Sequence, residues 1–342
     1  MHKPSIKPVG VPSRPFPMTL ILQSANGAHP TGPNESTAFF NFYTLLSKQM
    51  TPSFFYTKTM KISLLSSLIG AIAATCMVLM LCWQPAFAAQ GQEMLHGQSE
   101  DAYRRAQGGR WFAEAAKLSP DVLPTSDGQS FVVAWKAPGT NPKRWIVSLH
   151  GSRGFATDDL AIWYPSLRDR DVGLLSVQWW IGTDDTPRSY YAPLQIYREI
   201  DIALQKLGVQ PGMAMLHGFS RGSANSYAVA AIDTGRGRHY FSLIVASSGG
   251  VVTDFPPTRA ILAGAFGDHP LRGTRWVTAA GARDPNLDRD GIPAMRRTAA
   301  WLEEQGATVI ERIEDTAEGH GALQLNAANA RRVLDLYLNE QP

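Results

Sequence analysis

One stretch of the sequence places a potential nucleophile in a setting that would activate it. Residues 213–223 read Met-Ala-Met-Leu-His-Gly-Phe-Ser-Arg-Gly-Ser, which makes Ser220 the centre of a Gly-x-Ser-x-Gly pentapeptide. A short apolar run precedes the pentapeptide and a run of small residues, 223–232, follows it. This pattern predicts a strand, a sharp turn and a helix, and such a turn exposes the serine hydroxyl. The first N–H groups of the helix then face any negative charge that develops beside the serine.

The two glycines of the pentapeptide are expected because this turn is crowded. A Cβ atom at Gly218 or Gly222 would collide with the neighbouring strand and helix, so glycine is required at both places. Ser220 itself is expected to adopt a strained backbone conformation, which pushes its hydroxyl into the open.

A serine nucleophile needs a base that removes its proton and an acid that orients the base. Both are expected after the serine, on loops at the C-terminal ends of strands. Three histidines follow Ser220, and His320 is the best placed, because it lies between two glycines directly after the last expected strand. His239 precedes a strand, and His269 does not directly follow one. His320 is therefore the predicted base.

The predicted acid lies in the loop 281–290, which follows an expected strand. Asp284 is the first choice because it stands at the exit of that strand, and Asp288 is the reserve. Asp290 is expected to cap the helix that follows. An acid at this place would fix the tautomer of the imidazole and stabilise the imidazolium. The alternative is that all three carboxylates only solvate the loop.

An oxyanion that forms during acyl transfer needs two N–H donors. One is expected from the backbone of Arg221, the residue after the nucleophile. The other is expected from the His-Gly-Ser-Arg-Gly loop that begins at His150, with the amide of Ser152 as first choice and that of Arg153 as second. His150 itself and His217 are interpreted as packing residues that shape the loops.

The surrounding elements alternate between strands and helices. The expected strands are 131–135, 145–149, 174–180, 214–216, 243–246, 276–280 and 309–313. The expected helices are 103–118, 158–168, 197–207, 223–232, 292–304 and 322–339. This alternation predicts an α/β fold, with a mostly parallel central sheet and helices on both faces.

Four motifs together carry a resemblance to a known superfamily. They are His150-Gly151, Gly218-Phe219-Ser220-Arg221-Gly222, Gly281-Ala282-Arg283-Asp284 and Gly319-His320. In this order they resemble the α/β-hydrolase superfamily, over nearly all of residues 129–339. Within it, the compact form is similar to secreted esterases of the polyhydroxybutyrate-depolymerase and dienelactone-hydrolase type. The loop after His150 departs from the His-Gly-Gly-Gly form of many lipases and esterases, so the identity of the second oxyanion donor stays open.

The resemblance implies hydrolysis of a small-molecule ester or amide through an acyl-enzyme, with neither a cofactor nor a metal. A serine peptidase or amidase on the same fold, and a binding protein without catalysis, are the alternatives, because a fold does not fix a function. Trp179 and Trp180 end an expected strand and could form an aromatic wall for an acyl or aryl group, or belong to the core. The Pro/Gly-rich segment 253–273 could form a small lid.

The beginning of the chain has the pattern of an export signal. Met60-Lys61 is followed by an uncharged apolar stretch, 62–83, and by Ala86-Phe87-Ala88, which predicts a signal peptide over residues 60–88 that is cleaved after Ala88. The alternative is a retained membrane anchor, because the apolar stretch is long enough to span a bilayer. Residues 1–59 are interpreted as a non-native or disordered leader, and Met60 as the true start. We expect a periplasmic or secreted protein.

The remaining residues, 89–342, suit a single catalytic domain. The whole chain has a formal net charge of +3, of which residues 1–88 contribute +5, so about −2 remains for the mature part. No basic patch indicates binding to nucleic acid. Both cysteines, Cys76 and Cys82, lie in the apolar stretch, so the mature part has no disulfide, thiol nucleophile or cysteine metal site. The sequence does not indicate an oligomeric state.

Overall fold

The computed structural model describes residues 94–339. The predicted leader, 1–59, and the predicted signal peptide, 60–88, lie outside the described residues. Within residues 94–339, no helix combines the length and the apolar character needed to cross a bilayer.

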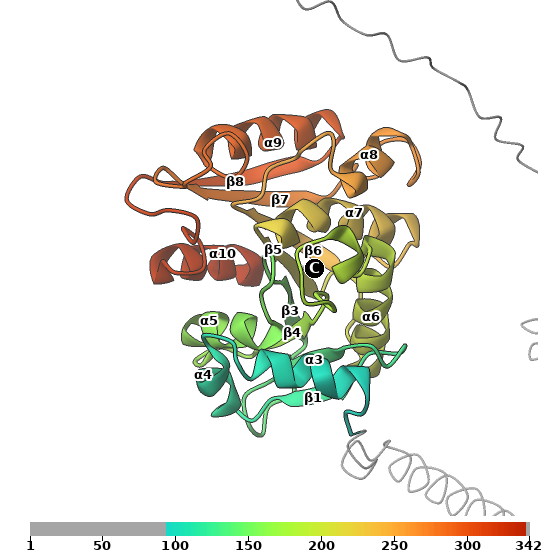
Figure 1. The fold of residues 1–342 in the computed structure, drawn as a ribbon. Coiled ribbons are helices and arrows are strands. Elements are labelled where there is room, and N and C mark those ends of the chain that lie inside the picture. Colours follow the sequence, from blue (N-terminus) through green and yellow to red (C-terminus); the bar gives the residue numbers. More distant parts are fainter. Residues whose placement is uncertain (1–93, 340–342) are drawn as a thin grey trace, which may run out of the picture. The chain divides into compact units, whose positions relative to one another are not determined.

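An eight-stranded sheet forms the centre of the fold (Figure 1). Its strands are β1 (Asp121–Pro124), β2 (Phe131–Trp135), β3 (Arg144–Leu149), β4 (Val172–Val177), β5 (Ala214–Phe219), β6 (Phe241–Ser247), β7 (Arg275–Gly281) and β8 (Thr308–Asp315). Their order in space is β1-β2-β4-β3-β5-β6-β7-β8. β2 pairs antiparallel with β1 and with β4, and the other neighbours are parallel. The parallel part brings the C-terminal ends of β3, β5, β6, β7 and β8 to one edge.

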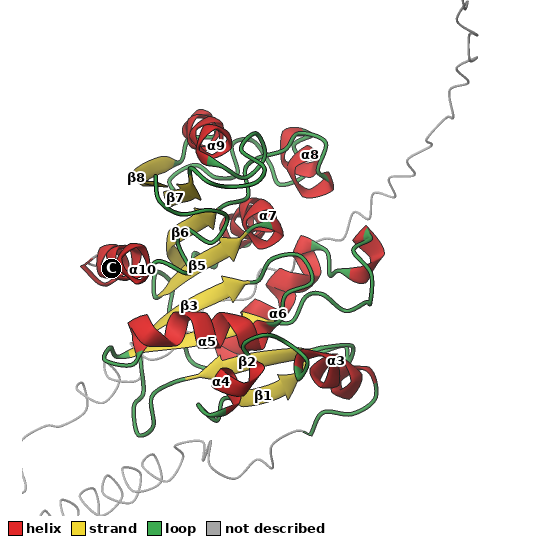
Figure 2. Cartoon of the chain, turned by 60° about the vertical axis from the view of Figure 1, so that its left-hand side comes forward, coloured by secondary structure: helices red, strands yellow, loops and turns green. Residues whose placement is uncertain are grey.

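Helices cover both faces of the sheet. They are α3 (Gln98–Ala106), α4 (Phe112–Ala116), α5 (Ala156–Leu167), α6 (Pro193–Lys206), α7 (Arg221–Gly235), α8 (Pro256–Leu262), α9 (Ile292–Glu304) and α10 (Ala327–Asn339). Figure 2 shows α5 and α10 on one side of the strands and α6, α7 and α8 on the other. The predicted α/β-hydrolase fold, a mostly parallel sheet with helices on both faces, is confirmed.

Two apolar clusters hold these layers together. One lies between the sheet and α6, α7 and α9, and includes Tyr227 and Trp276. The other lies between the sheet and α3, α5 and α10, and includes Trp163 and Tyr337. Because both faces are covered, the residues of the central strands are buried almost without exception. This buried sheet is a rigid base for the loops at its C-terminal edge.

The structure differs from the sequence-based expectations mainly at the ends of elements. The helix expected over 103–118 is two helices, α3 and α4, which Gly108 and Gly109 separate. β1 was not predicted, because a four-residue edge strand that ends in proline has little periodicity. The strand expected over 174–180 ends at Val177. The segment 253–273 contains α8, whose first two residues are prolines, as the first turn of a helix tolerates.

One buried carboxyl group should make the stability depend on pH. Asp159 of α5 accepts a hydrogen bond from Ser176 Oγ at 2.8 Å, and burial raises its pKa to about 7. The folded state therefore binds more protons than the unfolded state between the ordinary pKa of an aspartate and about pH 7. The contribution of Asp159 to the free energy of unfolding is therefore fully present at low pH. It is lost as the pH rises from the ordinary pKa of an aspartate to about 7.

We therefore expect Asp159→Asn, which cannot ionise, to have a higher Tm than the wild type at about pH 8 and to lose that advantage at about pH 4. Thermal unfolding of both proteins across this range measures the effect. A difference in Tm that is the same at every pH would contradict the assigned titration.

Candidate active site

Three side chains from three different loops meet at the C-terminal edge of the sheet. Ser220 follows β5, Asp284 follows β7 and His320 follows β8. The Ser220 Oγ lies 3.0 Å from His320 Nε2, and His320 Nδ1 lies 2.7 Å from Asp284 Oδ2. The Asp284 side chain is fully buried, whereas His320 is half-buried. In this arrangement the carboxylate can hold the proton on Nδ1, which leaves Nε2 free to accept the serine proton.

The backbone around Ser220 has the strained geometry that the pentapeptide predicts. Ser220 has φ 54° and ψ −118°, outside the regions that L-residues favour, and α7 begins at the next residue. A Cβ atom at Gly222 would lie 2.1 Å from the Leu149 carbonyl oxygen, and one at Gly218 would lie 2.5 Å from the Gly222 carbonyl oxygen. Both contacts are with backbone atoms that cannot move aside, so glycine is required at both positions.

The three carboxylates of the β7–α9 loop have different surroundings. Asp284 also accepts the backbone N–H of Asn286 at 2.8 Å, which fixes the second carboxylate oxygen. Asp288 is exposed. Asp290 does not cap α9, because the N-cap is Gly291 and no side chain bonds to it. It is buried instead and forms an ion pair with Arg289 at 2.7 Å.

Asp290 also lies close to the three aligned side chains. One of its carboxylate oxygens is within 4.8 Å of both an Asp284 oxygen and a His320 nitrogen. Such a trio of groups has the composition of a metal site, but both His320 nitrogens already face Ser220 and Asp284. The charge of Asp290 is balanced by Arg289, and the same pair raises the pKa of that guanidinium. Asp290 therefore adds little net charge beside the imidazole.

Two backbone amides near Ser220 are available as donors. Among the residues described, no hydrogen bond uses the N–H of Arg221 or of Ser152. Ser152 lines the same pocket as Ser220, and a Cβ atom at the neighbouring Gly151 would lie 3.3 Å from Ser220 Cβ. The amide of Arg153 is already engaged, because it donates to the Tyr190 hydroxyl at 3.0 Å. The placement thus favours Ser152 over Arg153 as the second donor.

The two neighbouring histidines are neutral packing residues, as the sequence indicated. His150 stacks on Trp179 and its Nδ1 lies 2.9 Å from the Gly151 carbonyl oxygen, while burial lowers its pKa to about 4. His217 lies under the edge of Trp163, and burial lowers its pKa to about 3. Neither can carry a positive charge into the site near neutral pH.

Tyr190 connects the loop of Ser152 to the start of α7. Its hydroxyl accepts the Arg153 N–H and donates to Asp185 Oδ1, and Asp185 also binds the Arg221 guanidinium at 2.6 Å. The Arg221 guanidinium lies 4.1 Å from the centre of the Tyr190 ring. Burial raises the pKa of Tyr190, so the phenol stays protonated and can donate. This network fixes the turn from which the Ser152 amide would reach an oxyanion.

We expect Tyr190→Phe to lower kcat about tenfold and to leave KM nearly unchanged. The ring and its stacking remain, but the Arg153 amide loses its acceptor and the turn loosens, which affects the transition state more than the ground state. Steady-state kinetics on any cleaved ester measures the effect. Tyr240→Phe is the matched control, because the Tyr240 hydroxyl bonds to Asp201, which lines neither of the two pockets described below. An equal effect of the two changes would argue against the role of Tyr190.

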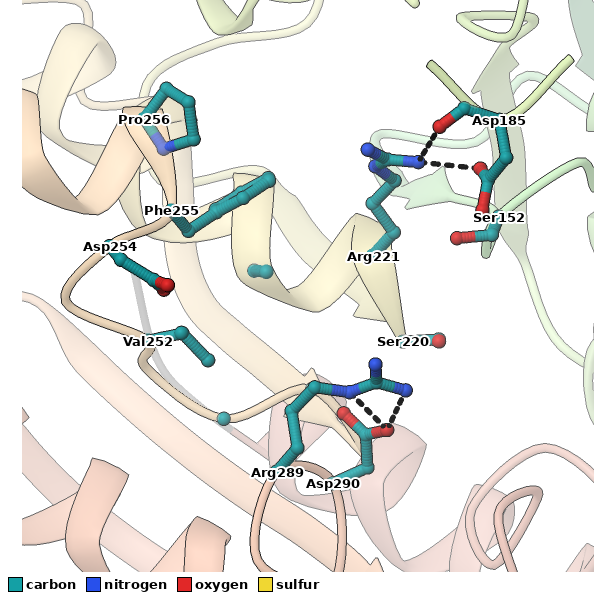
Figure 3. Close-up of a pocket in the computed structure, with 13 residues that line it drawn as sticks. Ser152, Asp185, Ser220, Arg221, Val252, Asp254, Phe255, Pro256, Arg289 and Asp290 are labelled. Carbon is teal, nitrogen blue, oxygen red and sulfur yellow. Dashed lines mark hydrogen bonds and ion pairs between the residues drawn. The ribbon is translucent and has the colours of Figure 1, made fainter. Parts of the chain in front are cut away.

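A charged pocket of about 580 Å³ opens beside Ser220 and is called here the catalytic pocket. Figure 3 shows Arg221 held by Asp185 on one side of it and Arg289 held by Asp290 on another. Phe255 and Val252, from the segment before α8, form a third side. The pocket thus offers donors and acceptors close to the serine hydroxyl.

A second pocket, of about 550 Å³, is lined mainly by apolar side chains and is called here the apolar pocket. Trp179 belongs to its wall, and the Trp179 Nε1–H has no partner among the described residues. Trp180 lines neither pocket, because it packs against Phe155 and its Nε1 donates to the Asp184 carbonyl oxygen. Of the two tryptophans considered as an aromatic wall for the substrate, only Trp179 lines a pocket near Ser220.

Several residues of the site were not found by sequence reasoning. They are Asp185 and Tyr190, in the β4–α6 connection, and the Arg289–Asp290 pair. The available signal was the position of the connection, since loops at the C-terminal ends of parallel strands commonly form binding sites. The run from Gly182 to Tyr191 is rich in polar and aromatic residues and lies between an expected strand and an expected helix.

No family model matches the chain, and no curated protein matches it. Solved structures with a similar fold include TT1662 from Thermus thermophilus, which is 20% identical, with 65% of this chain and 98% of that chain covered and a TM-score of 0.48. A carboxylesterase from Mesorhizobium loti is 20% identical, with 60% and 94% covered and a TM-score of 0.45. A phospholipase/carboxylesterase from Dyadobacter fermentans is 16% identical, with 61% and 96% covered and a TM-score of 0.44. At these identities the likeness concerns the fold, and a function has to be argued from the site.

Proposed function

We propose that this protein is a serine hydrolase that cleaves carboxylic esters through an acyl-enzyme. The observation that carries the proposal is the hydrogen-bonded chain from Ser220 through His320 to the buried Asp284. A strained serine, an imidazole and a buried carboxylate at these distances form the arrangement that activates a hydroxyl for acyl transfer. The two available amides, of Arg221 and Ser152, supply the donors that such a reaction needs.

In the proposed reaction, His320 Nε2 takes the proton of Ser220 as the serine oxygen attacks the ester carbonyl carbon. The carbonyl oxygen becomes negative and is stabilised by the amides of Arg221 and Ser152. The imidazolium, which Asp284 stabilises, then gives its proton to the departing alcohol, and Ser220 is left acylated. A water molecule then attacks the acyl carbon while His320 Nε2 takes one of its protons. As the bond from the acyl carbon to Ser220 Oγ breaks, the imidazolium returns that proton to Oγ and the acid is released. The residues named supply every proton transfer.

Substrate panels test the proposal directly. We expect hydrolysis of p-nitrophenyl esters and of simple alkyl esters, and little or no hydrolysis of aminoacyl anilides. The finer resemblance to polyhydroxybutyrate depolymerases and dienelactone hydrolases adds hydroxyalkanoate oligomers and lactones to the panel. Faster cleavage of the anilides would indicate a peptidase, and no cleavage of any substrate would indicate a binding protein.

We also propose that the protein is exported and begins at Ala89 after removal of residues 60–88. The support is the sequence Ala86-Phe87-Ala88, whose small side chains follow an apolar stretch as in a signal peptidase site. N-terminal sequencing of the protein recovered from the periplasm or medium is expected to begin at Ala89. An intact 62–83 segment in the membrane fraction would indicate an anchored hydrolase instead.

A further inference from the structure

The apolar pocket meets the catalytic pocket along a shared border. Arg221, Phe255 and Pro256 line both. Beyond that border the wall changes in character, from charged side chains around Ser220 to the aromatic and aliphatic side chains of Trp179, Leu194 and other residues of the β4–α6 connection, α6 and α8. A substrate with its carbonyl at Ser220 can therefore reach the apolar pocket with one of its two arms.

The border between the two pockets is a fixed structure. The Arg221 guanidinium is bound to Asp185 at 2.6 Å and stacks on the Tyr190 ring, and only 19% of the Arg221 side chain is exposed. A side chain that is held by both a charge and an aromatic face does not move freely. Arg221 thus separates a polar compartment from an apolar one, and a substrate arm must pass beside it.

The rim of the apolar pocket has a feature that indicates a ligand. Leu194 is 53% exposed at its rim, next to other apolar side chains. Exposed apolar surface that adjoins a reactive centre commonly marks a ligand site.

We propose that the natural substrate is an ester with two unlike arms, of which one is an apolar group of aromatic size that lies in the apolar pocket. The other arm stays in the catalytic pocket, where the Arg221–Asp185 and Arg289–Asp290 pairs suit a polar group. This inference rests on the proposed function, because it assigns the substrate of the same serine. Selectivity comes from the border at Arg221, which keeps the two arms in separate compartments.

The test compares three alkyl esters under identical conditions in a pH-stat assay. Methyl butanoate has no aromatic arm, methyl 3-phenylpropanoate has one on the acyl side, and 3-phenylpropyl acetate has one on the alcohol side. The wild type is expected to cleave at least one of the two aryl esters with a kcat/KM about tenfold or more above that for methyl butanoate. The ester that is preferred also shows which arm occupies the apolar pocket.

Two variants relate this preference to the pocket. Ala260→Phe fills the pocket from α8, and the preference for the aryl ester is expected to fall about tenfold. Leu194→Glu places a charge at the rim, in the first turn of α6, where an acid favours the helix and folding is retained. Its preference should fall similarly. The matched control is Ala263→Phe, which adds the same ring at the exposed end of α8 and should keep the wild-type preference.

The possible results separate this inference from the proposed function. The assignment of the apolar pocket is overturned if the wild type cleaves all three esters with equal kcat/KM. It is also overturned if Ala260→Phe and Leu194→Glu both keep the wild-type preference. In either case the proposed ester hydrolysis stands. Absence of hydrolysis of any ester overturns the proposed function, and the substrate assignment with it.

Discussion

Replacing Ser220 by alanine is expected to lower kcat by at least ~10⁴-fold and to leave the fold intact. The reason is that nucleophile and base act as a unit, so the loss of the hydroxyl removes covalent catalysis altogether. Within the described residues, the only hydrogen bond of Ser220 Oγ is the one to His320. The substitution therefore leaves no buried polar group of the core unpaired. Steady-state kinetics and thermal unfolding of the same preparation measure the two effects.

The unusual backbone of Ser220 calls for a matched control. Ser119 also has a positive φ, 48° against 54° for Ser220, and it is exposed and outside both pockets. Ser119→Ala places alanine at another position of positive φ without touching the site, and its activity should equal that of the wild type. A fluorophosphonate probe should label the wild type once, at Ser220, and should not label Ser220→Ala. Labelling of another serine would disprove the assignment of the nucleophile.

The three aligned side chains were predictable because short-range rules place each of them. The glycines on both sides of Ser220 require a strand, turn and helix, and strands that alternate with helices bring the following loops to the same edge. Asp284 and His320 could then be chosen by their position after a strand. The structure brings all three within hydrogen-bonding distance.

The network around them was not predictable in this way. Asp185 and Arg221 are 36 residues apart in sequence, and their contact depends on how the β4–α6 connection folds over the site. No periodicity describes that connection. Similarly, Asp290 was expected to cap α9, but Gly291 occupies the cap position and Asp290 pairs with Arg289. The sequence shows that Asp290 lies just before a helix. Which group its carboxylate binds is determined by tertiary packing, which the sequence pattern does not describe.

Asp284→Asn is expected to lower kcat by roughly 10⁴-fold while the structure of the site is retained. Asp284 Oδ1 accepts the Asn286 N–H, so the amide oxygen of an asparagine would take that place. The amide NH₂ would then face His320 Nδ1 and donate to it. The proton of the neutral imidazole would move to Nε2, which faces Ser220 and could no longer accept the serine proton.

Asp288→Asn is the matched control, because Asp288 lies in the same loop and is exposed. Its kcat should stay within about twofold of the wild type, since a solvated carboxylate outside the site contributes little to catalysis or stability. Asp290→Asn would be a poor control, because it unpairs the Arg289 guanidinium at the edge of the catalytic pocket. If Asp288→Asn proved to be the disabling change and Asp284→Asn the mild one, the acid would have been assigned four residues too early. The 2.7 Å contact between Asp284 and His320 predicts the opposite result.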